Sequence, residues 1–62
     1  MDPNANLREQ EEILINRART GMTRAYSSRL RLLREALAGW IRSGGFEPDW
    51  TLAPHARQYY SR

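Results

Sequence analysis

The chain has 62 residues, of which ten are Arg and none is Lys or Cys, and its formal net charge is +3. This length allows one domain with a marginal core, which in small proteins usually needs a disulfide, a metal or a partner chain. The lack of Cys excludes disulfides and thiolate metal sites, and one His cannot build a metal site by itself. We therefore expect self-association or a partner protein.

A first helix is predicted over residues 3–19, with Asp2 as its N-cap and Pro3 at its first position. At helical spacing, one side of this segment carries Leu7, Leu14, Ile15 and Ala18. Ile13 falls outside that sector, and the acid Glu11 lies within it. A stripe with so few apolar residues is not expected to stabilise the helix in water without a packing partner.

A second helix is predicted over residues 23–43, after a break at Gly21 and with Thr23 as N-cap. It ends at the two glycines 44 and 45, which can adopt the left-handed conformation of a helix C-cap. Its apolar stripe, the clearest in the chain, consists of Tyr26, Leu30, Leu33, Leu37, Trp40 and Ile41.

The predicted fold class is all-α: a two-helix antiparallel hairpin over residues 1–50 with an extended aromatic C-terminal tail, oligomeric or bound to a partner. Residues 44–50 are expected to close the open end of the hairpin as an aromatic plug, with Trp50 against the second helix. Residues 51–62 form the tail, which either contains a short helix after Pro54 or is disordered. The rival is one long helix, kinked at its glycine, that pairs with another chain.

Membrane and signal segments are not expected. No run of about 18 apolar residues occurs, and residues 1–4 lack the basic and apolar regions that begin a signal peptide. A cytoplasmic location is therefore the expectation.

No arrangement in the sequence is typical of catalysis. Glu9 and Glu12 are three residues apart, but no His follows at the interval of carboxylate metal sites. His55 has no Ser partner in a recognisable triad order, and the paired glycines stop a helix rather than form a phosphate loop. We expect no enzyme activity, and no catalytic residue, cofactor or metal.

Two binding surfaces remain as alternatives. Apolar residues outside the inferred core, with nearby Arg, favour a protein-binding helical module, whose predicted contacts are Ile13, Arg24, Arg31, Leu32, Tyr59 and Tyr60. Residues 13–34 hold six Arg and no acid, which favours a nucleic-acid-binding protein. Its predicted phosphate contacts are Arg17, Arg19, Arg24, Arg31, Arg34 and Arg42.

The opening MDPNANL (residues 1–7), together with GGF at 44–46 and P-x-W at 48–50, resembles a group of short uncharacterised proteins from phages and GC-rich bacteria. These begin MDPNA and end in a helix followed by a GGF-x-P tail, from which residues 51–62 depart. The resemblance implies no activity. A phage or mobile-element origin would favour a small protein that binds a larger one, or a structural peptide of a large assembly.

Overall fold

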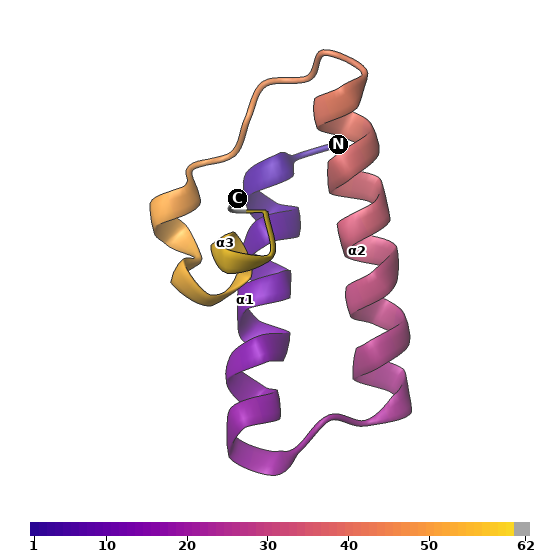
Figure 1. Ribbon diagram of the computed structural model, residues 1–62, viewed down its shortest axis with the longest axis vertical. Coiled ribbons are helices and arrows are strands. Elements are labelled where there is room, and N and C mark those ends of the chain that lie inside the picture. The colour runs from indigo at the N-terminus through magenta and orange to yellow at the C-terminus, as the bar shows by residue number, and fades with distance from the viewer. Residues whose placement is uncertain (61–62) are drawn as a thin grey trace.

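The computed structural model describes residues 1–60, which form the helices α1 (Pro3–Thr20), α2 (Arg24–Arg42), η1 (Trp50–Leu52, a 3-10 helix) and α3 (Pro54–Tyr60). These residues contain no strand, so the all-α prediction is confirmed. α1 and α2 lie side by side, joined by a short connection, and η1 and α3 pack against α1 (Figure 1). The last two residues of the predicted tail lie outside the described part.

Both ends of α1 follow from local chemistry. The Asp2 carboxylate accepts a hydrogen bond from the backbone N–H of Asn4 at 3.0 Å, as an N-cap does. At the other end, the N–H of Gly21 donates to the carbonyl of Arg17 at 2.8 Å. Gly21 has a φ of 88°, a conformation that glycine adopts without strain, so the helix stops there.

α2 ends in a turn that also positions two aromatic rings. Gly44, with a φ of 95°, donates its N–H to Ile41, and the N–H of Gly45 donates to the carbonyl of Trp40 at 2.9 Å. The indole of Trp40 lies directly on Gly45, where an added Cβ would be 2.3 Å from the ring. Trp40 also donates from Nε1 to the carbonyl of Phe46 at 2.8 Å and meets the Phe46 ring edge to face. Phe46 thus covers part of the Trp40 indole but remains 63% exposed, so it does not close the end of the hairpin as a plug.

Trp50 packs on the core cluster that contains Leu37 of α2, as the sequence predicted, and it also contacts α3. Its ring lies 5.1 Å, centroid to centroid, from the ring of Tyr60 on α3. The core cluster consists of four fully buried residues, which are Leu7, Leu37, Ala53 and Ala56. Residues 50–60 are thus largely helical and packed on α1. The extended tail is wrong for this part, whereas the alternative of a short helix after Pro54 agrees with α3.

A second core cluster corrects the predicted apolar face of α1. Ile13, expected outside the core, is only 5% exposed and packs with Leu30 and Leu33 of α2. Ile15, expected inside, is 42% exposed, and Ala18 is exposed too. The reason is that α1 is covered by α2 on one side and by α3 on another, so its buried face is wider than one stripe and centred elsewhere.

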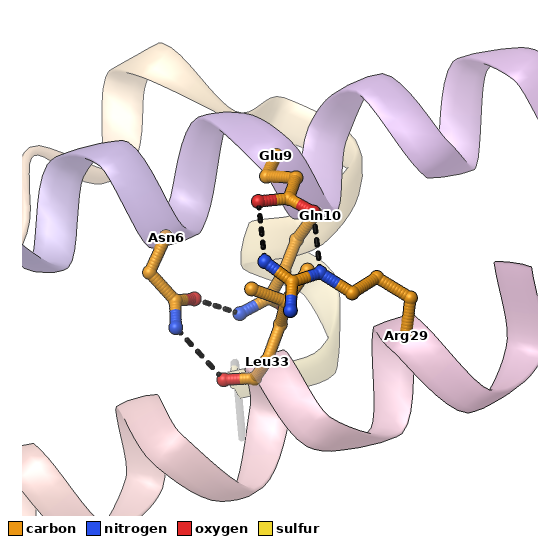
Figure 2. Close-up of polar contacts among 5 residues, drawn as sticks. All are labelled: Asn6, Glu9, Gln10, Arg29 and Leu33. Carbon is orange, nitrogen blue, oxygen red and sulfur yellow. Dashed lines mark hydrogen bonds and ion pairs between the residues drawn. The ribbon is translucent and has the colours of Figure 1, made fainter.

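Buried polar side chains connect the three α-helices. Asn6 of α1 donates from Nδ2 to the backbone carbonyl of Leu33 on α2 at 3.0 Å. Gln10 donates from Nε2 to Oδ1 of Asn6 at 2.7 Å (Figure 2). The hydroxyl of Tyr60 on α3 donates to Oε1 of Gln10 at 3.0 Å. Burial raises the pKa of Tyr60, so this hydroxyl keeps the proton that it donates.

Glu11, the acid in the apolar stripe, caps α3 from another helix. Its side chain is buried, and Oε1 accepts hydrogen bonds from the backbone N–H groups of His55 at 3.0 Å and Ala56 at 2.9 Å. Oε2 lies 2.6 Å from Nδ1 of the His55 ring. Burial raises the pKa of the Glu11 carboxyl, but these hydrogen bonds outweigh it, so the net pKa is below its usual value. An ionised Glu11 therefore holds the first turn of α3 on α1.

Candidate binding groove

A groove opens where α1, α2 and α3 meet. It has two adjoining parts of about 490 and 400 Å³, which share Arg17, Arg34 and Tyr59 as lining residues. The first part is completed by Met22, Ser27, Leu30, Arg31, Glu35 and Ala38. The second is completed by Leu14, Ala18, His55 and Gln58. We call the two parts together the arginine groove.

Arg34 is the central side chain of the arginine groove. Its guanidinium carbon lies 4.0 Å from the centroid of the Tyr59 ring, which is the geometry of a cation–π interaction. Its Nε is buried and has no hydrogen-bond partner among residues 1–60. Stacking therefore holds the flat face of Arg34, while its terminal N–H groups, which lie in the plane of the guanidinium, remain suited to a bidentate anion.

The charge of the arginine groove is positive. Arg17 and Arg31 are exposed and line it together with Arg34, whereas Glu35 is the acid among the lining residues. A concave surface that carries one sign of charge attracts ligands of the opposite sign more strongly than a flat one does. The lining also includes aliphatic side chains, so the groove suits an anionic group attached to an apolar one.

Arg29 illustrates the opposite arrangement on another side of the molecule. It donates from Nε and Nη2 to the two carboxylate oxygens of Glu9, at 2.6 and 3.0 Å (Figure 2). The hydrogen bond from Arg29 holds the pKa of Glu9 below its usual value. Because a carboxylate of the chain itself already occupies this guanidinium, Arg29 is not a candidate for an external anion.

The structure separates the predicted protein-contact residues. Arg31 and Tyr59 line the arginine groove, but Ile13 is in the core, so its prediction as a surface contact is wrong. Leu32 is 53% exposed, and neither it nor the exposed Arg24 lines the groove. The last member, Tyr60, is partly buried, bonded to Gln10 and turned toward Trp50.

The predicted phosphate contacts are divided in the same way. Three of them, Arg17, Arg31 and Arg34, come together in the arginine groove, whereas Arg19, Arg24 and Arg42 do not line it. Sequence reasoning missed the pairing of Arg34 with Tyr59, which is 25 residues further on. The only available signal was the apolar pair at 59 and 60, which favoured docking of the tail without naming its site.

Comparison with family models, with curated proteins and with solved structures found no match for this chain. Within residues 1–60, no cluster of three or more His, Asp or Glu is placed to hold a metal ion. None of the helices described is both long and apolar enough to cross a bilayer.

Proposed function

We propose that this protein is a protein-binding module that captures an acidic segment of a partner in the arginine groove. The observation that supports this most directly is the convergence of Arg17, Arg31 and Arg34 on one concave surface. Arg is the cation best suited to carboxylates, because its planar fork of N–H groups matches their two oxygens. Tyr59, stacked on Arg34, adds the aromatic surface that is common at protein interfaces.

A protein partner fits the groove better than a nucleic acid does. A phosphate backbone is contacted by several cations along its path, but Arg19, Arg24 and Arg42 lie outside the groove. Apolar side chains also line the groove, and a phosphate backbone offers them no apolar partner. Carboxylates interspersed with apolar and basic side chains, as in a polypeptide, match this surface.

We propose further that α1 and α2 act as an antiparallel hairpin, a scaffold for the groove, and that the partner is another protein rather than a second copy. α3 and the residue before it cover the apolar surface that a partner helix would otherwise have to cover, since Ala53 and Ala56 are fully buried against Leu7 and Leu37. Two arginine grooves would repel one another. Sedimentation should therefore give a monomer at micromolar concentration, and a concentration-dependent dimer would contradict this.

A small surface of this kind implies weak, salt-sensitive binding. Contacts confined to one groove are at the lower end of protein interfaces, where complexes are transient. We expect a dissociation constant on the order of micromolar at low salt, with weaker binding as salt is raised because the attraction is screened.

Charge reversal at matched positions tests the proposal. A fluorescent peptide rich in Asp, Glu and Leu is titrated with the wild type, with Arg31→Glu and with Arg24→Glu. Both arginines are exposed on α2, but only Arg31 lines the groove, so we expect Arg31→Glu to weaken binding by about ten-fold or more and Arg24→Glu by less than about three-fold. Equal effects would contradict the groove, and tighter binding of a single-stranded oligonucleotide would favour the nucleic-acid alternative.

A further inference from the structure

A second hollow of different chemistry lies further along α2 and shares one lining residue with the arginine groove. This hollow, of about 300 Å³, is lined by Ala38, Ile41, Arg42, Glu47, Trp50 and Tyr60. A further recess of about 170 Å³ adjoins it and shares Trp50 and Tyr60. Ala38 lines both the second hollow and the arginine groove. The two therefore meet at a residue whose side chain is a single methyl group.

The second hollow is suited to an apolar side chain. One wall is the pair of rings Trp50 and Tyr60, which contact each other with their centroids 5.1 Å apart, and Ile41 lies beside them. The charged side chains Arg42 and Glu47 complete the lining. Both rings are fixed before a ligand arrives. The hydroxyl of Tyr60 is bonded to Gln10, and Trp50 begins η1, whose cap residue Asp49 donates its N–H to Asn4 at 2.7 Å. Walls held in place lose little entropy when a side chain packs against them.

The separation of the two hollows defines a ligand of a particular length. Arg34 and Ile41 are seven residues apart on α2, about two helical turns, or roughly 10 Å. An extended peptide covers that distance in about three residues. A helical ligand would need about seven residues to cover the same distance.

We propose that the two hollows form one channel that binds an extended segment of the partner, with an acidic residue at Arg34 and an apolar or aromatic residue packed against Trp50, Tyr60 and Ile41. These two ligand residues are about three positions apart. This proposal rests on the proposed function and adds the sequence pattern that the groove selects.

A bulky substitution at the junction tests the channel. Ala38→Tyr fills the point where the two hollows meet, whereas Ala36→Tyr is the matched control, since both alanines are exposed on α2 and residue 36 lines neither hollow. Circular dichroism confirms that both variants fold. With a peptide that carries Asp and Phe three positions apart, we expect Ala38→Tyr to weaken binding by about ten-fold or more and Ala36→Tyr by less than about two-fold.

The peptide itself is varied in parallel. Replacing Phe by Ser should weaken binding about ten-fold, the effect of losing a buried aromatic side chain. Moving Phe one position along the peptide should lose most of the affinity that Phe adds relative to Ser. Peptides with Asp before Phe and peptides with Phe before Asp are both titrated. The channel would be overturned, and the proposed function left intact, if the acidic peptide bound equally well with Ser in place of Phe and bound the Ala38→Tyr variant as well as the wild type. If no acidic peptide bound, both the channel and the proposed function would be overturned. If binding were tightest with Asp and Phe seven positions apart, the extended conformation of the ligand would be overturned.

Discussion

The guanidinium of Arg34 on α2 lies over the ring of Tyr59 on α3, with its central carbon 4.0 Å from the ring centroid. α3 has its place because Glu11 of α1 accepts the N–H groups of its first turn. The orientation of Arg34 thus depends on all three helices. The arginine groove is complete only while α3 is docked, which connects the stability of the C-terminal segment to binding.

Removing the ring at position 59 should weaken both the fold and the binding of an acidic peptide. A partly exposed cation–π pair contributes about 0.5–1 kcal/mol, so we expect Tyr59→Ala to lower the affinity about two- to five-fold. Tyr59→Phe keeps the ring and should bind like the wild type. Isothermal titration of the three proteins measures this, and a loss with Tyr59→Phe equal to that with Tyr59→Ala would show that stacking is not the cause.

Replacing the buried carboxylate Glu11 by an amide should loosen α3. Hydrogen bonds to a charged group contribute about 1.5–3 kcal/mol, and we expect Glu11→Gln to lower the free energy of unfolding by about 1–2 kcal/mol at pH 7. Hydrogen exchange at the amides of His55 and Ala56 should become faster, while exchange in the middle of α2 should change less. Unchanged exchange at these two amides would contradict the capping role.

The pH dependence of the Glu11→Gln effect is set by the lowered pKa of the wild-type carboxyl. Because this pKa is lower in the folded protein than in the unfolded chain, the unfolded state takes up a proton first as the pH falls. The stabilisation by Glu11 is therefore complete above a pH of about 4.5, the usual carboxyl value, and is lost as the pH falls through the folded pKa. Glu9 and Asp49 also have lowered pKa values. Both residues are present in the wild type and in Glu11→Gln, so their contributions cancel in the difference between the two free energies of unfolding.

The helix ends could be predicted from the sequence because caps and stops are local. The predicted helices over 3–19 and 23–43 compare with Pro3–Thr20 and Arg24–Arg42 in the structure. The apolar stripe of α2 could also be predicted, from its helical spacing, and its residue Leu37 is fully buried. The buried face of α1 could not be read in this way, because its width depends on α3.

The groove was predictable only in part. The excess of Arg in residues 13–34 indicated a basic surface, but the sequence did not say which arginines are already paired. Arg29 is neutralised by Glu9, which lies 20 residues earlier, and Arg34 is stacked on a ring 25 residues later. Glu11 looked like a defect in an apolar stripe because its partners, the backbone N–H groups of α3, are more than 40 residues away. Such pairings follow from the packing of the helices rather than from spacing along the chain.

The hydrogen-bond chain through Asn6 predicts a large effect for an isosteric change. Asn6→Asp replaces the donor to the Leu33 carbonyl by an oxygen and places a charge in a buried position, so we expect stability to fall by about 1–3 kcal/mol. Asn4→Asp is the control, because the side chain of Asn4 only accepts, from the N–H of Asp49, and a carboxylate can do the same. Its effect should stay within about 0.5 kcal/mol. Urea unfolding followed by tryptophan fluorescence compares them, and equal effects would contradict the donor role of Asn6.

Two glycines on either side of Trp40 should respond in opposite directions to the same substitution. Gly39 lies inside α2, where an added Cβ would meet Nη2 of Arg42 at 3.9 Å, an ordinary van der Waals contact. Gly39→Ala should therefore stabilise the protein by about 0.5–1 kcal/mol through helix propensity. At Gly45 the added methyl would overlap the indole of Trp40, which must then leave its place and lose its hydrogen bond to the Phe46 carbonyl. We expect Gly45→Ala to lower the stability by about 1–3 kcal/mol and to shift the tryptophan emission to the red as the indole becomes exposed. A Gly45→Ala protein with wild-type stability and emission would mean that the indole does not pack on this glycine in solution.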